Sequence, residues 1–69
     1  MVDRARMLLV QHFLHAFGIL HNAPDGSWGP ISINACKFYQ AHNNLQQTGL
    51  PDEATFVSIV NKSFLAGSR

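Results

Sequence analysis

Apolar residues recur at helical spacing in three segments of the chain, and turn-forming residues separate these segments. The first segment predicts a helix over residues 3–17, in which, at about 100° per residue, several apolar residues share one face that Val10 borders. Gln11 and His15 lie on the opposite, polar side of this helix. The predicted apolar face consists of Ala5, Leu9, Phe13, Ala16 and Phe17.

The second segment predicts a helix over residues 30–42. Pro30 suits its first position, because a helix start leaves that N–H unpaired in any case. Gln40 is expected to point mostly outward, as are Asn34 and Lys37. The side chains expected on the inner face are Ser32, Ala35, Cys36 and Tyr39.

The third segment predicts a helix over residues 52–65. Asp52 is a good N-cap, and Glu53 in the first turn suits the helix dipole. The apolar residues at helical spacing are Phe56, Ile59, Val60 and Phe64. The chain is therefore expected to be an all-α, compact three-helix bundle, a single domain over residues 1–69 with its core in 8–60.

The two connections between these helices resemble one another. Asp25-Gly26 is followed by Ser32 six residues after the glycine, and Thr48-Gly49 is followed by Thr55 at the same interval. In both copies a turn leads into a helix that carries a hydroxyl in its first turns. Two structured loop-to-helix pseudo-repeats are therefore expected.

Composition narrows the function classes. The 69 residues are 46% hydrophobic and only 13% charged, with a net charge of +1. Such a chain has no basic footprint for nucleic acid, and no apolar run is long enough to span a membrane. Because most of so short a chain must form the core, composition favours a binding module without catalysis.

The central motif is Asp25-Gly26-Ser27-Trp28-Gly29-Pro30, followed by Ala35 and then Tyr39-Gln40. A leading Leu9-Val10-Gln11 and a trailing segment from Thr48-Gly49-Leu50 to Ile59 flank it. Together, residues 8–60 resemble the peptidoglycan-binding domain family, the three-helix modules of cell-wall hydrolases. Within that pattern, Asn43-Asn44-Leu45 stands where Gly-Leu is usual, and Thr48 stands where a second Asp is usual.

The resemblance implies non-catalytic binding of bacterial peptidoglycan, which anchors or targets an associated protein to the wall. The ligand would be the peptide or the glycan part, held in a shallow cleft between the loops and the second helix. Aromatic rings and side-chain amides suit such a ligand. The candidate ligand-binding residues are Asp25, Trp28, Tyr39, Gln40, Asn43 and Asn44. A structural role is the other interpretation, and it comes first for Asp25, for Trp28, which would pack the loop onto the core, and for Tyr39, which is expected in the core with its hydroxyl at the rim.

Metal and cofactor chemistry is not expected. His12 and His15 share a helix face, but no further ligand accompanies them at suitable spacing. Cys36 and His42 are about 9 Å apart along one helix, too far for a nucleophile and its base. An inert buried thiol is the expected state of Cys36.

The alternative function is a protein-interaction domain built on the same fold, self-associating or phage-encoded. Its expected surface is the surplus apolar set on the first helix, Met7, Val10 and Leu14. The resemblance places the protein in the cell wall or periplasm. Residues 7–20 do not read as a secretory signal, because polar residues interrupt the apolar run, so cytoplasmic or phage-delivered action is also compatible.

Overall fold

Three α-helices make up the regular structure of this protein. The structure, a computed structural model, describes the backbone of residues 4–67 and the side chains of residues 4–62. The helices are α1 (Arg4–Ala16), α2 (Pro30–His42) and α3 (Glu53–Gly67), with no strand between residues 4 and 67. The predicted all-α fold is confirmed, and each helix lies within two residues of its predicted bounds.

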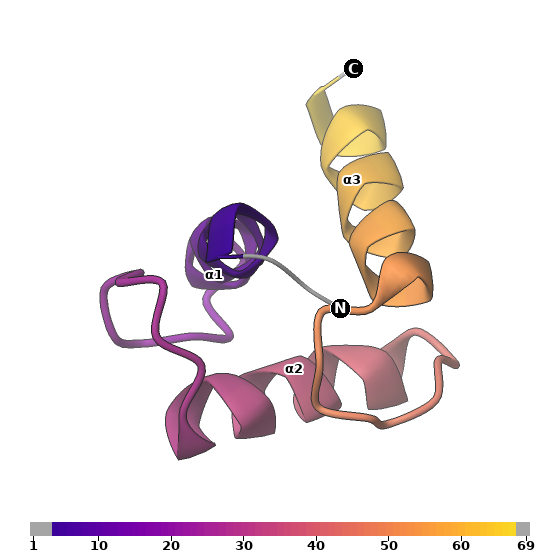
Figure 1. Ribbon diagram of the computed structural model, residues 1–69. Coiled ribbons are helices and arrows are strands. Elements are labelled where there is room, and N and C mark those ends of the chain that lie inside the picture. The colour runs from indigo at the N-terminus through magenta and orange to yellow at the C-terminus, as the bar shows by residue number, and fades with distance from the viewer. Residues whose placement is uncertain (1–3, 68–69) are drawn as a thin grey trace.

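Helix α1 contacts both other helices. In Figure 1, α2 crosses below α1 and α3, and one loop joins α2 to each of its neighbours along the chain. The core lies where the three helices face one another. Its buried apolar members are Val10, Leu14, Leu20, Ala35, Cys36, Tyr39 and Ile59.

The predicted inner face of α1 is partly wrong. Val10, Gln11 and Leu14 are buried, whereas Leu9 is 42% exposed. Because α1 packs on α2 and α3 together, its buried arc centres on Val10 and Leu14. Phe13 and Phe17 remain at the edge of this arc, half-buried against the core, and the predicted members Ala5 and Ala16 are exposed.

This shift removes the predicted interaction surface on α1. Val10 and Leu14 are completely buried, and Met7 is only half-exposed. No contiguous patch of these three residues is therefore open to a protein partner. Phe64, one of the apolar residues at helical spacing in the third predicted helix, lies outside the residues whose side chains the structure describes.

The first two helices end in the same backbone motif. Gly18 has φ +82°, and the Ile19 N–H donates to Leu14 O at 3.0 Å. After α2, Asn44 has φ +58°, and the Leu45 N–H donates to Gln40 O at 2.9 Å. Both are Schellman-type ends, in which a left-handed residue lets the next N–H pair with a free helix carbonyl. Asn44 thus takes the position that glycine usually holds.

Within residues 4–67, no helix is both long enough and apolar enough to cross a bilayer.

Candidate functional site

The loop between α1 and α2 folds around one buried amide, that of Gln11. Its Oε1 accepts hydrogen bonds from Gly26 N at 2.7 Å and Asp25 N at 3.2 Å. Its Nε2 donates to Ser27 O and to Ser32 Oγ, both at 2.8 Å. A primary amide offers both donors and acceptors, so this one side chain satisfies N–H groups and a carbonyl group of the loop backbone. The prediction that Gln11 lies on the polar face is wrong.

The loop between α2 and α3 is held by Gln40 in the same way. Gln40 Oε1 accepts from Gly49 N at 2.9 Å, and Nε2 donates to Leu50 O at 3.2 Å and Thr55 Oγ1 at 2.8 Å. Thr48 Oγ1, 3.0 Å from Nε2, also belongs to this cluster. Gln40 is 0% exposed, so the prediction that it points outward is wrong.

The two amide clusters are copies of one arrangement. In each, a glutamine binds a glycine N–H, the carbonyl of the following residue and a hydroxyl six residues after the glycine. Gly26 and Gly49 both have positive φ, +81° and +74°. The four buried polar side chains among the described residues are the two glutamines with Ser32 and Thr55. The pseudo-repeat expected from sequence is therefore a repeated three-dimensional unit.

Trp28 connects the two loops. Its indole Nε1 donates to Gly49 O at 2.8 Å, and its half-buried ring packs against the core. Gly49 also lies against α2, because a β-carbon built on it would stand 2.8 Å from Ile33 Cγ2. These contacts bring the two loops together over one side of α2.

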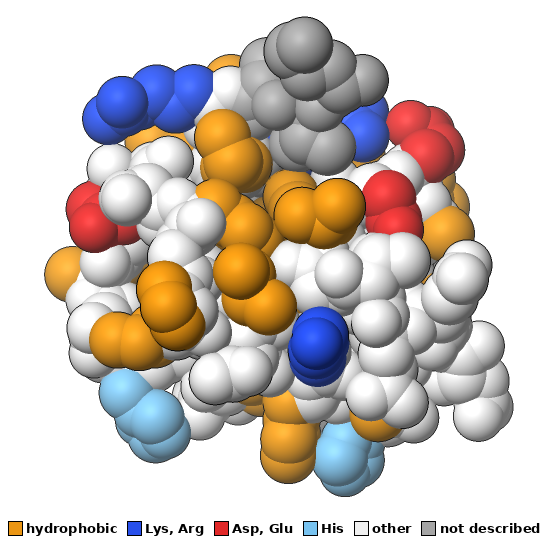
Figure 2. Space-filling model, turned by 60° about the horizontal axis from the view of Figure 1, so that its bottom comes forward, with side chains coloured by type: hydrophobic (Ala, Val, Ile, Leu, Met, Phe, Trp, Pro, Cys, Tyr) orange, Lys and Arg blue, Asp and Glu red, His pale blue; other side chains and the backbone are white. Residues whose placement is uncertain are grey.

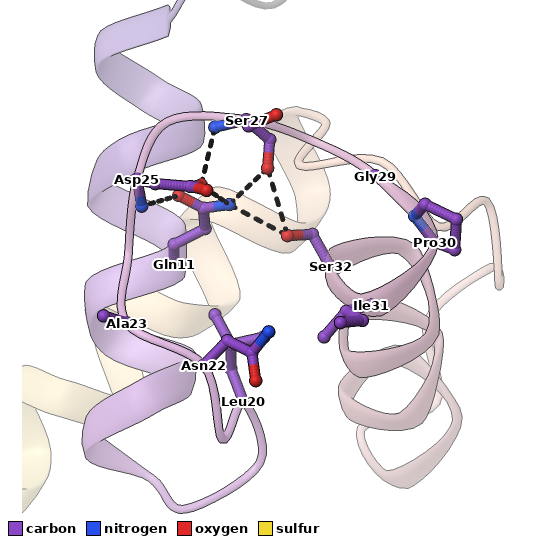
Figure 3. Close-up of a pocket in the computed structure, with 10 residues that line it drawn as sticks. All are labelled: Gln11, Leu20, Asn22, Ala23, Asp25, Ser27, Gly29, Pro30, Ile31 and Ser32. Carbon is purple, nitrogen blue, oxygen red and sulfur yellow. Dashed lines mark hydrogen bonds between the residues drawn. The ribbon is translucent and has the colours of Figure 1, made fainter.

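A pocket of about 150 Å³ opens beside the first amide cluster. Figure 3 shows it between the 20–29 loop and the start of α2, with the Gln11 hydrogen bonds closing one side. Gly29, the N-cap of α2, provides no side-chain cap, and Pro30 has no N–H. Exposed Asn22, Asp25 and Ser27 supply polar groups at its lining. The pocket thus combines an uncapped helix start with three accessible polar side chains.

Of the six predicted ligand-binding residues, the structure places only Asp25 at this pocket. Its Oδ1 accepts a hydrogen bond from Ser27 N at 2.8 Å and lies 3.5 Å from Gln11 Nε2. The carboxylate therefore shapes the loop while staying exposed. Trp28 lies outside the pocket lining, at the contact between the loops.

Tyr39 and Gln40 lie inside the protein. Tyr39 is 2% exposed, its hydroxyl pairs with Ser58 Oγ at 2.8 Å, and its ring stacks on Phe17 with centroids 6.1 Å apart. The Gln40 amide forms hydrogen bonds with the backbone of the second loop. In this conformation neither side chain offers a group to a ligand; both hold the elements that carry the loops.

Asn43 and Asn44 lie at the C-terminal end of α2, away from the pocket. Asn43 Nδ2 donates to Tyr39 O at 2.8 Å, which satisfies a carbonyl of the last turn. Asn44 is exposed and carries the left-handed backbone of the helix end. Both residues therefore have structural roles at the end of this helix.

Two ionisable groups near the second loop have shifted pKa values. Burial and the nearby Asp52 charge raise the pKa of the Cys36 thiol to about 12, so it stays protonated at neutral pH. Burial acts to raise the pKa of Asp52, but hydrogen bonds with Thr55 and Thr48 outweigh it, and the pKa falls below 3.8. Asp52 caps α3 as predicted, accepting from Thr55 N at 3.1 Å. Neither group is arranged for catalysis.

Among the described residues, no three His, Cys, Asp or Glu side chains gather in a way that would hold a metal ion.

The family model described as Putative peptidoglycan binding domain matches residues 3–59 of the 69-residue chain. The chain belongs to this family. The match includes α1, both loops, α2 and the first half of α3, and so contains both amide clusters and the pocket. Comparison with curated proteins and with solved structures finds no significant match. Membership identifies a binding domain with the three-helix fold of this peptidoglycan-binding domain family.

Sequence reasoning missed Gln11 and Asn22. A signal for Gln11 was present, because each loop-to-helix unit follows a helix with an apolar residue directly before glutamine, Val10-Gln11 and Tyr39-Gln40. A helical wheel places both glutamines on the outer side of their helices and so predicts that they are exposed. In the structure the loops cover them. Asn22 has no such signal, since its position at the pocket depends on the path of the loop.

Proposed function

We propose that this domain anchors an associated protein to bacterial peptidoglycan, and that the pocket at the start of α2 receives the peptide part of the wall. The observation that carries the proposal is the pocket itself, within a chain of the peptidoglycan-binding domain family. Peptide stems present amides and carboxylates. Exposed Asn22, Asp25 and Ser27 supply hydrogen-bonding partners for the amides of such a stem.

Anchoring needs no chemical step by the domain. The Cys36 thiol is buried and protonated, and Asp52 is occupied as a helix cap. A weak attachment would act through effective concentration, because holding an enzyme on its polymer makes each further encounter intramolecular. We place this action at the cell wall or in the periplasm. The alternative, a protein partner, stays a prediction without an assigned surface, because the surface expected on α1 is largely buried.

The test is co-sedimentation with insoluble sacculi. The wild-type chain should pellet with them and release no soluble fragments. Asn22→Ala should weaken binding about fivefold, the effect of losing one hydrogen bond of about 1 kcal/mol. Asn61→Ala is the matched control, because Asn61 is exposed on α3 outside the pocket. A folded wild-type chain that stays in the supernatant would refute the proposal.

A further inference from the structure

A larger groove adjoins the pocket. It has a volume of about 650 Å³ and lies between the segment that follows α1 and the exposed side of α2. Asn22 and Ile31 line both the groove and the pocket, so the two hollows meet at these residues. One polymeric ligand can therefore extend from the pocket into the groove.

The groove is apolar and accessible. Ile31 and Phe38 are 54% and 52% exposed, large values for such side chains, and both line it. Figure 2 shows hydrophobic side chains gathered on one face of the molecule, with one Lys or Arg side chain beside them and the other charged side chains toward the edge. His42 stacks on the Phe38 ring at 4.2 Å between centroids, which restricts the orientation of that ring. A restricted ring loses less entropy when a ligand contacts it.

The chemistry of the lining selects against a charged occupant. Apart from the His21 imidazole, none of the described side chains that line the groove is ionisable. Placing an ionised carboxylate or amine there would cost desolvation energy without a paired charge. The side-chain amides of Asn22 and Asn34 instead offer neutral donors and acceptors beside the apolar surface.

We infer that this groove binds the glycan part of peptidoglycan, the uncharged N-acetylated sugar rings, while the adjoining pocket takes the peptide. Sugar rings combine apolar C–H faces with neutral acetamido groups, which match the Phe and Ile side chains and the Asn amides respectively. This inference rests on the proposed function, because the choice of ligand depends on peptidoglycan being the polymer that is bound.

The experiment is a titration of the ¹⁵N-labelled full chain with a soluble tetramer of N-acetylglucosamine, which lacks peptide. Backbone amide shifts should concentrate in residues 17–22 and 34–38. Phe38→Ala should bind about tenfold more weakly, equivalent to about 1.4 kcal/mol, and Phe38→Tyr should retain binding. Val57→Ala is the matched control, an exposed apolar residue of α3 outside the groove.

The outcomes separate the two proposals. If the chain pellets with sacculi but the sugar tetramer shifts no amide around the groove, the glycan inference fails and anchoring stands. Equal affinities of the wild-type chain and a folded Phe38→Ala variant would also overturn the glycan inference. If the chain does not pellet with sacculi, the proposed function fails, and the assignment of this groove to wall glycan fails with it.

Discussion

At the residue scale, two buried glutamines, Gln11 and Gln40, hold the backbone of the two loops in place. Each binds loop backbone through both ends of its amide, and the described buried side-chain polar atoms all have a partner. A buried donor or acceptor that loses its partner costs about 1–3 kcal/mol. The loops, and with them the pocket, therefore depend on Gln11 and Gln40 although neither is an exposed site residue.

Truncating either glutamine should strongly destabilise the fold. Gln11→Ala and Gln40→Ala are each expected to lower the free energy of unfolding by about 3 kcal/mol or more, since each strands several buried backbone groups. Gln47→Ala is the matched control, because Gln47 is exposed and should change stability by less than about 0.5 kcal/mol. Urea denaturation followed by circular dichroism measures all three. Equal midpoints for the buried and exposed substitutions would contradict the assigned role.

Asn44 permits a test that separates backbone from side chain. Asn44→Gly keeps the left-handed conformation but removes the amide, whereas Asn44→Ala keeps neither and should lose about 1 kcal/mol of stability. If Asn44 serves only the helix end, Asn44→Gly should pellet with sacculi as well as the wild type. If the glycine variant is stable but no longer pellets with sacculi, the Asn44 side chain contacts the ligand, as predicted from the sequence.

At the element scale, the helices could be predicted from sequence and their orientations could not. Helical periodicity, Pro30 and the Asp52 cap are local signals, so all three helices lie close to their predicted bounds. Which side of α1 faces inward depends on two other helices and a loop. For this reason the wheel misplaced Leu9 and Gln11. The pocket needs the path of the loop, which no local pattern encodes.

The contact between the second loop and α2 predicts different costs for two glycines. Both Gly18 and Gly49 have positive φ, so alanine is strained at either position. A new β-carbon at Gly18 meets nothing within 4 Å, but at Gly49 it would approach Ile33 Cγ2 to 2.8 Å. Gly18→Ala should therefore cost about 1–2 kcal/mol, and Gly49→Ala clearly more. Thermal unfolding of both variants provides the comparison, and a smaller loss for Gly49→Ala would contradict the packing described.

The Asp52 cap predicts how stability depends on pH. Its folded-state pKa is lowered, so its stabilisation is fully present above the unfolded value of 3.8 and is lost as the pH falls through the folded value. Asp52→Asn retains an acceptor for Thr55 N but cannot titrate. The variant should show a weaker loss of stability below about pH 4. Acid unfolding curves of equal steepness for both chains would contradict this assignment.

At the scale of the whole molecule, a small core supports the two joined hollows that we propose as the binding surface. Repetition of one amide-centred unit lets a chain this short order two long loops, and Trp28 fastens them together. The low charge noted in the sequence fits a surface whose polar pocket and apolar groove meet at Asn22 and Ile31. In the proposed function, binding therefore depends on the geometry of the loops rather than on any single reactive group.

The most direct measurement is a titration of the ¹⁵N-labelled chain with soluble muropeptides, fragments that carry both sugar and peptide. We expect saturable amide shifts in residues 20–32 around the pocket and, from the sugar part, in residues 17–22 and 34–38 along the groove, with the exposed side of α3 unchanged. Asn61→Ala should reproduce these shifts, and Asn22→Ala should require a higher concentration of fragment. No shifts at any concentration, or shifts confined to α3, would refute the proposal that this pocket binds peptidoglycan.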